Sequence, residues 1–393
     1  MFESLERKPP DAILKLIGEY GSDPRAEKID LGVGVYRDAA GDTPVFRAIK
    51  MAEQRLLETQ TSKSYLGSRG AADFCDAMQT LVFADGANSD RVMTLQTPGG
   101  SGALRVAAGV ILRANPETTL WVSDPSWANH VPLLGGAGVK LAIYPYYDTE
   151  QNELRFDAML DAINTAPAGD VILLHGCCHN PTGMDLSVEQ WDAIIDVIVD
   201  RDLVPFVDLA YQGFADSLDK DAYGVRTLLA RVPEMIVTTS CSKNFGLYRE
   251  RVGALTFVST NAEAAGIVSS QALNIVRTLY SVPPDHGGAA VTFILNDTNL
   301  RNEWLDELTG MRDRMKEMRK LIVAGLAKSA PDHDFSHIER ANGMFCYLGI
   351  SQEQVAQLKK DCGIYIVDSS RINVCGITAG NVNYLAESIA SVL

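Results

Sequence analysis

The sequence has no uninterrupted apolar stretch approaching 18 residues, which argues against a membrane-spanning helix. Its first residues also lack the apolar core of a secretory leader. Positive charge is in deficit, because 35 Lys and Arg oppose 50 Asp and Glu, a net charge of −15. This balance disfavours non-specific binding to nucleic acid or anionic membranes. We therefore expect a cytoplasmic protein that binds small molecules, with no nucleic-acid and no membrane partner.

The cysteine pattern gives no sign of a disulfide framework or a metal site. Seven cysteines form an odd set without a Cys-x-x-Cys pair, which favours reduced thiols. His175, Cys177, Cys178 and His179 gather histidine and cysteine, but they crowd the end of an apolar strand and have no second half-site. We interpret them as core and loop residues and predict no metal.

The glycine-rich run Thr97-Pro98-Gly99-Gly100-Ser101-Gly102 lacks the spacing of a P-loop or a dinucleotide fingerprint, which counts against ATP and NAD. It follows a predicted strand, Val92 to Leu95, and opens a predicted helix that continues to Arg113. The free N–H groups at the start of a helix suit a phosphate. Alone, this turn is a weak indication of a phosphate site.

Apolar strands and amphipathic helices alternate through the middle of the chain, which predicts an α/β fold with a mostly parallel sheet and helices on both faces. The predicted strands are Leu120 to Ser123, Lys140 to Tyr144, Asp170 to His175, Leu203 to Asp208, Met235 to Thr239 and Val252 to Val258. Asp124-Pro125-Ser126-Trp127 is expected to cap a helix. Such sheets bind ligands beyond the carboxyl ends of their strands.

Two domains are expected. A helix over Asp11 to Tyr20, behind Pro9-Pro10, belongs to an N-terminal arm, and a long helix from Leu300 to about Ser329 leads to a smaller C-terminal α/β domain. We divide the chain into residues 1–40, the arm with part of the small domain, residues 41–300, the large domain, and residues 301–393, the small domain.

The stretch Ser240-Cys241-Ser242-Lys243-Asn244 follows a predicted strand, and Arg251 lies eight residues beyond the lysine. A lysine acts as a nucleophile when burial or a nearby positive charge disfavours its ammonium form. Two hydroxyls and a guanidinium suit a phosphate. Lysine together with a phosphate grip suggests pyridoxal phosphate, whose aldehyde condenses with a lysine amine. The alternative is a surface loop with a solvated Lys and Arg.

Asp208 ends the apolar run Leu203-Val204-Pro205-Phe206-Val207, where a carboxylate is costly unless it is paired. A protonated pyridine nitrogen would pair with it and keep the cofactor's ring an electron sink. The alternative is that Asp208 caps the N-terminus of the following segment. The presence of Lys243 favours the cofactor role.

The chain resembles, over essentially its whole length, the class I aspartate and aromatic (tyrosine) aminotransferases, which are pyridoxal-phosphate enzymes of fold type I. The resemblance rests on several motifs taken together. They are Leu31-Gly32-Val33-Gly34-Val35-Tyr36, Ser123-Asp124-Pro125, His179-Asn180-Pro181-Thr182-Gly183, Asp208-Leu209-Ala210-Tyr211-Gln212-Gly213-Phe214, Ser240-Cys241-Ser242-Lys243-Asn244 and Tyr280-Ser281-Val282-Pro283-Pro284.

This resemblance implies roles for individual residues. Lys243 would carry the cofactor and shuttle the proton of the substrate's Cα, and Asp208 would hold the pyridine nitrogen. Tyr211 and Asn180 would bind the ring oxygen, and Trp127 would stack on the ring. The phosphate would be held by Gly100, Ser101, Ser240, Ser242 and Arg251 of one chain and by Tyr65 of a second copy in a homodimer. Gly34 would face the substrate, and Arg371 would clamp its α-carboxylate; a structural salt bridge is the alternative for Arg371.

Substrate choice depends on Arg277, which matches the arginine that crosses the dimer to bind the distal carboxylate of aspartate, glutamate or 2-oxoglutarate in this family. Val282 and Ser64 stand where many aspartate-specialised members have asparagine, which leaves Arg277 freer to swing aside for an aromatic ring. His175-Gly176-Cys177-Cys178-His179 also resembles the aromatic members. We therefore expect ping-pong transfer of the amino group from phenylalanine, tyrosine, tryptophan and aspartate to 2-oxoglutarate; a dedicated aspartate aminotransferase is the alternative.

Two further functions stay open. A β-decarboxylase or lyase of the same fold would use the same residues, and single-turnover spectra would distinguish it. A non-catalytic ligand-binding or regulatory protein on this scaffold is disfavoured by the intact Lys243 and Asp208.

Overall fold

The computed structural model describes residues 1–7, 12–87 and 89–393. Its centre is a seven-stranded sheet in the order β2-β10-β9-β8-β7-β3-β4. These strands are β2 (Val92–Pro98), β3 (Thr119–Asp124), β4 (Lys140–Pro145), β7 (Val171–His175), β8 (Val204–Leu209), β9 (Met235–Ser240) and β10 (Val252–Val258). Within the sheet β10 pairs antiparallel with both β2 and β9, whereas the other pairs are parallel. The expected mostly parallel α/β sheet is confirmed.

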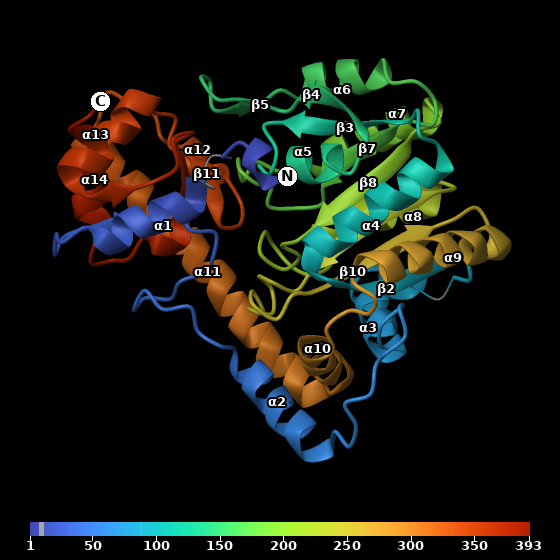
Figure 1. Ribbon diagram of the computed structural model, residues 1–393. Coiled ribbons are helices and arrows are strands. Elements are labelled where there is room, and N and C mark those ends of the chain that lie inside the picture. Colours follow the sequence, from blue (N-terminus) through green and yellow to red (C-terminus); the bar gives the residue numbers. More distant parts are fainter. Residues whose placement is uncertain (8–11, 88) are drawn as a thin grey trace.

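Helices cover both faces of this sheet, because alternate strand residues enter two different cores (Figure 1). Leu173 joins one core and Ile172 and Leu174 the other. The first face is covered by α4 (Gly99–Ala114), α5 (His130–Gly135) and α9 (Ala262–Leu279). The second is covered by α3 (Ala72–Phe83), α6 (Phe156–Asn164), α7 (Val188–Asp200) and α8 (Tyr223–Arg231).

The 32-residue helix α11 (Thr298–Ser329) runs from the large sheet's side of the molecule to a smaller C-terminal lobe (Figure 1). At its start it packs beside α2 (Arg47–Thr59) and α10 (His286–Asn296), and farther along it contacts α14 (Val382–Ala390). The lobe also holds α12 (His337–Arg340), α13 (Gln352–Cys362), and strands β11 (Phe345–Tyr347), β12 (Ile364–Tyr365) and β13 (Arg371–Asn373).

The N-terminal segment lies against the C-terminal lobe. Strand β1 (Ile29–Asp30) pairs parallel with β12, and Asn373 Nδ2 donates to the carbonyls of Val33 and Val35 at 2.6 and 2.8 Å. Helix α1 (Ala12–Ser22) precedes this strand, and β5 (Tyr147–Asp148) and β6 (Glu153–Leu154) form a small hairpin elsewhere. The expected helix start at Asp11 and the preceding Pro9-Pro10 lie outside the described residues. The division into domains at residues 40 and 300 stays a prediction.

One local expectation is wrong. Asp124-Pro125-Ser126-Trp127 does not cap a helix, because β3 runs through Asp124 and α5 begins only at His130. The intervening residues form a loop that carries Trp127 past the end of the sheet. Within the described residues, every helix is too short or too polar to cross a bilayer.

Candidate active site

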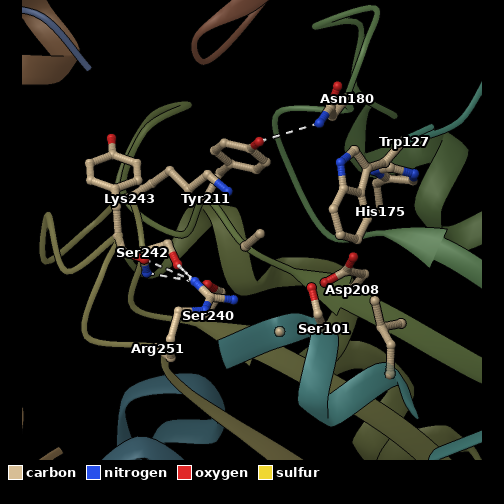
Figure 2. Close-up of a pocket in the computed structure, with 14 residues that line it drawn as sticks. Ser101, Trp127, His175, Asn180, Asp208, Tyr211, Ser240, Ser242, Lys243 and Arg251 are labelled. Atoms are coloured by element: carbon tan, nitrogen blue, oxygen red, sulfur yellow. Dashed lines mark hydrogen bonds between the residues drawn. The ribbon is translucent and has the colours of Figure 1, made fainter. Parts of the chain in front are cut away.

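A cavity of about 220 Å³ opens beyond the carboxyl ends of the parallel strands, where the sequence predicts a ligand site (Figure 2). Ten predicted site residues line it. They are Gly100, Ser101, Trp127, Asn180, Asp208, Tyr211, Ser240, Ser242, Lys243 and Arg251. Leu104, His175, Ala210 and Tyr248 complete the lining.

Lys243 lies in the loop that follows β9 and is held there by the packing of its neighbours. The Lys243 carbonyl accepts the N–H of Gly246 at 3.0 Å, and Trp304 of α11 donates its Nε1 to the Asn244 carbonyl at 2.6 Å. The rings of Phe245 and Trp304 stack with centroids 4.4 Å apart. Desolvation lowers the pKa of the Lys243 amine to about 8; Asp208 opposes this shift and Arg251 adds to it. The amine is therefore partly unprotonated near neutral pH.

Asp208, the penultimate residue of β8, lines the cavity, and two side chains, His130 and Thr238, contact its carboxylate. His130 Nε2 lies 2.9 Å from Asp208 Oδ2, and Thr238 Oγ1 donates to Oδ1 at 3.0 Å. Burial raises the pKa of Asp208, but the bonds from His130 and Thr238 outweigh it and leave the pKa below its ordinary value. Asp208 is thus an ionised carboxylate that can accept a hydrogen bond from a donor in the cavity.

Sequence reasoning missed His130, although the cost of burying Asp208 indicated that some partner had to exist. Since an ionised carboxylate only accepts, His130 Nε2 carries the proton of this bond. Its Nδ1 lies 2.8 Å from Ser126 Oγ, which is also 3.2 Å from His175 Nε2. His130 is supplied by the start of α5, 78 residues before Asp208, and no local pattern links the two.

The predicted phosphate-binding residues gather at one end of the cavity (Figure 2). Gly100 and Ser101 lie in the first turn of α4, whose N–H groups have no partner within the helix. Arg251 Nη1 donates to Ser242 Oγ at 3.4 Å and to the Tyr248 carbonyl at 3.0 Å. This end offers neutral donors, a guanidinium and the positive end of a helix dipole, which together favour a dianion.

Gly99 allows this arrangement because it has no side chain. A Cβ at Gly99 would lie 2.5 Å from Arg251 Nη2, and its backbone has φ +71°, in the left-handed region. Any other residue would displace the guanidinium.

Tyr211 and Asn180 approach each other on the side of the cavity away from Asp208 (Figure 2). Asn180 Nδ2 donates to Tyr211 OH at 3.5 Å, and burial raises the pKa of Tyr211 well above its ordinary value. Trp127 lies beside Asn180 and His175 (Figure 2), and its ring makes a T-shaped contact with that of His130, with centroids 5.2 Å apart. A flat ring bound in this cavity would meet a phenol and an amide at one edge.

The His175 to His179 segment packs as a hydrogen-bonded cluster. His179 Nε2 lies 3.1 Å from Ser123 Oγ, and its ring stacks on Tyr146 with centroids 3.9 Å apart. Burial lowers the pKa of His175 to about 3 and that of His179 well below its ordinary value. Both rings are therefore neutral in the physiological range.

Four predicted residues do not line the cavity of this chain. Arg371 is buried beside it and donates from Nη2 to the Gly32 carbonyl at 2.7 Å. Gly34 lies next to the ring of Phe345, whose Cζ would be 3.4 Å from an added Cβ. Tyr65 is 93% exposed, and Arg277, at the end of α9, donates to Ser281 Oγ on the surface. The roles of all four stay predictions.

The groups around the cavity match the chemistry of pyridoxal phosphate. Lys243 offers an amine to an aldehyde, Asp208 offers a carboxylate to a ring N–H, and Tyr211 and Asn180 offer donors to a ring oxygen. Ser101, Ser242 and Arg251 offer donors to a phosphate. Every polar group of the cofactor would have a partner of opposite hydrogen-bonding character.

Comparison with known proteins gives a consistent result. The sequence model of the family described as "Aminotransferase class I and II" matches residues 26–389. An aspartate aminotransferase of Haemophilus influenzae is 46% identical, with 100% of both chains covered. An aromatic-amino-acid aminotransferase of Pseudomonas aeruginosa is also 46% identical and covers 100% of this chain and 98% of its own.

Similar solved structures include the aromatic-amino-acid aminotransferase of Burkholderia pseudomallei covalently bound to pyridoxal phosphate. It superposes with a TM-score of 0.98 at 41% identity, covering 100% of this chain and 99% of its own. The expected fold type is confirmed.

Proposed function

This chain belongs to the class I and II aminotransferases, and from that premise we propose that it transfers the amino group of phenylalanine, tyrosine, tryptophan and aspartate to 2-oxoglutarate. It is a pyridoxal-phosphate-dependent transaminase. The observation that carries the proposal is that a lysine of lowered pKa, an ionised aspartate and a set of phosphate-binding groups line the same cavity. The reaction is proposed to proceed by a ping-pong course, in which the donor leaves as an oxo acid before the acceptor enters.

When bound, the cofactor supplies an aldehyde that carries the amino group and a ring that takes up negative charge from the substrate's Cα. Lys243 would hold the cofactor covalently, and its Nζ would remove the proton from the substrate's Cα. Asp208, kept ionised by His130, would hold the proton on the ring nitrogen. The phosphate would be held by Gly100, Ser101, Ser240, Ser242 and Arg251, and Trp127 would cover one face of the ring.

Arg371 is proposed to bind the α-carboxylate. Among the described residues no carboxylate forms an ion pair with its guanidinium, and its buried Nε has no hydrogen-bond partner. A buried cation without an anion is costly, so a site of this kind favours an anionic ligand. The two-pronged contact would orient the Cα–H bond toward Lys243, with Gly34 leaving room for the substrate.

The surroundings of Arg277 support acceptance of both dicarboxylic and aromatic side chains. Its guanidinium reaches the surface and bonds to Ser281, next to the apolar Val282. Ser64 bonds to Ser62 Oγ at 2.9 Å rather than to Arg277. An arginine held by one hydroxyl can bind a distal carboxylate or move aside. A dedicated aspartate aminotransferase remains the second candidate, and the 46% identity to such an enzyme favours it equally.

We also propose a homodimer, in which Tyr65 and Arg277 serve the site of the second copy. Each matches the family's motif but lies away from the cavity of its own chain. Large apolar side chains stay exposed close to both in sequence, Leu57 at 78% and Leu279 at 43%. Contact with a second copy would bury them. The seven cysteines are free, which supports a reducing, cytoplasmic location.

A single-turnover experiment tests the reaction class. The purified protein, loaded with pyridoxal phosphate, is mixed with phenylalanine or aspartate without an acceptor. We expect one equivalent of oxo acid per site, loss of the aldehyde absorbance, and its return when 2-oxoglutarate is added. Release of carbon dioxide or ammonia with the aldehyde spectrum restored in every cycle would show a decarboxylase or lyase instead. Values of kcat/KM for aspartate, phenylalanine and tyrosine then rank the donors.

A further inference from the structure

The guanidinium of Arg371 is held on two sides within the described part of the chain. Nη2 donates to the Gly32 carbonyl at 2.7 Å, and Cζ lies 4.3 Å from the centroid of the Phe345 ring. Arg371 and Phe345 are both buried, with 7% and 3% of their surfaces exposed. A cation over the face of an aromatic ring is attracted by the ring's negative face, and the attraction is strongest where water is excluded.

Strand pairing sets this contact. In the antiparallel pair β11 and β13, Phe345 is opposite Asn373 and Tyr347 is opposite Arg371. Phe345 and Arg371 are therefore diagonal neighbours on one face of the pair, within reach of each other's long side chains.

The backbone of Phe345 is fixed independently of its ring. Arg319, a fully buried residue of α11, donates from Nη2 to the Phe345 carbonyl and to the Gly343 carbonyl, each at 2.9 Å. Nη1 of Arg319 donates to the Ile338 carbonyl at 3.0 Å. A change confined to the Phe345 ring leaves these bonds in place, so the ring's contribution can be tested by itself.

The same ring reaches the large domain's side of the site. It meets Tyr211 edge to face, with centroids 6.4 Å apart and planes at 86°, and its Cζ faces Gly34. Phe345 thus contacts the carboxylate-binding arginine, the tyrosine of the cavity and the glycine at the substrate's side.

We propose that Phe345 is a positioning residue for Arg371: its ring face holds the guanidinium plane so that the unpartnered N–H groups meet the carboxylate of the substrate. The inference rests on the proposed function, because it assigns a carboxylate to Arg371. An arginine side chain has several rotatable bonds, and holding it in one orientation before the ligand arrives reduces the entropy lost on binding. Without the ring, the hydrogen bond to the Gly32 carbonyl would still hold Nη2.

The test measures binding rather than turnover. The probes are 3-phenylpropanoate and succinate, which carry a carboxylate but no amine, titrated calorimetrically into enzyme loaded with pyridoxal phosphate. Phe345 is replaced by 3-fluorophenylalanine and by 3,5-difluorophenylalanine, which remove negative charge from the ring face and leave Cζ, which faces Gly34, unsubstituted. Phe345→Leu removes the ring. Phe345→Tyr is unsuitable, because its hydroxyl would project from Cζ toward Gly34.

We expect Kd to rise stepwise with the number of fluorine atoms and to be about fivefold to thirtyfold higher in Phe345→Leu. KM for amino acids should rise with kcat less affected. Arg371→Leu should raise Kd more than Phe345→Leu does. Adding Phe345→Leu to Arg371→Leu should not raise Kd any further, since the two residues would act through one interaction.

A Kd that does not change with fluorination overturns the proposal even if Phe345→Leu binds the probes weakly, because lost packing would then explain the weaker binding. Equal losses from Phe345→Leu with and without Arg371 overturn it as well. These failures differ from failure of the proposed function, which would appear first as a wild-type protein that neither retains the cofactor nor transfers an amino group.

Discussion

Lys243 Nζ lies 5.1 Å from the centroid of the Tyr211 ring, inside the cavity at the carboxyl edge of the sheet. Desolvation of the amine in this cavity is the largest cause of its lowered pKa. Arg251, at the phosphate end, lowers the pKa further, whereas Asp208 raises it. The position of one amine between these two charges sets the reactivity of the site.

The first prediction concerns pH. In cofactor-free protein, the rate of reaction of Lys243 with pyridoxal should rise about tenfold per pH unit below pH 8 and level off above it, because only the neutral amine attacks. Arg251→Gln removes a lowering influence and should move the inflection to higher pH. Stopped-flow absorbance measures the rate, with Lys243→Ala as the blank. An inflection near pH 10.5, the pKa of a solvated lysine, would show that the site does not lower the pKa of Lys243.

The second prediction concerns the phosphate end. Arg251→Gln should weaken pyridoxal phosphate binding about 10- to 100-fold, because a charge-assisted bond to the phosphate is lost. Binding of pyridoxal, which has no phosphate, should not weaken when both proteins are compared above the inflection of their Lys243 titration. Arg249→Gln is the matched control, since Arg249 is exposed and does not line the cavity. An equal loss of affinity for pyridoxal phosphate and for pyridoxal would show that Arg251 does not bind the phosphate.

The sequence predicts those site residues whose position follows from a local pattern, and it fails for contacts between residues that are far apart along the chain. Lys243 and Asp208 each follow an apolar run, and parallel strands bring their carboxyl ends to one edge, so local pattern alone predicted their meeting. The partner of Asp208 could not be predicted in this way, because His130 belongs to a short helix whose position depends on the loop after β3.

The same limit applied to parts of the fold. The segment of α10, His286-Gly287-Gly288-Ala289-Ala290-Val291, is apolar on all sides, so it shows no amphipathic period and gave no helix prediction. The antiparallel direction of β10 also left no local signal, since a fully buried strand reads the same in either direction.

The third prediction concerns substrate choice. Arg277→Leu should lower kcat/KM for aspartate about 30-fold or more and change that for phenylalanine by less than about threefold, since only aspartate offers a distal carboxylate. Steady-state kinetics with 2-oxopentanoate, an acceptor that lacks this carboxylate, measure both donors. Arg113→Leu is a useful control, because Arg113 also contacts α9, through Gln271 and Asn274. Equal losses for both donors would mean that Arg277 is structural.

The fourth prediction concerns the shared site. Lys243→Ala and Tyr65→Ala chains should each be inactive or weakly active alone, and mixing them after mild dissociation should restore about a quarter of wild-type activity. Half of the dimers formed are hybrids, and each hybrid has one site with both residues intact. Activity that does not rise on mixing, or a protein that sediments as a fully active monomer, would refute the shared site.

The central claim is that Lys243 binds pyridoxal phosphate covalently while Asp208 holds its ring nitrogen. The most direct measurement is borohydride reduction of the loaded protein, followed by digestion and peptide mass spectrometry. We expect a single pyridoxyl-phosphate adduct on Lys243, and markedly weaker retention of the cofactor before reduction in Asp208→Ala. An unmodified Lys243, or adducts spread over surface lysines, would contradict it.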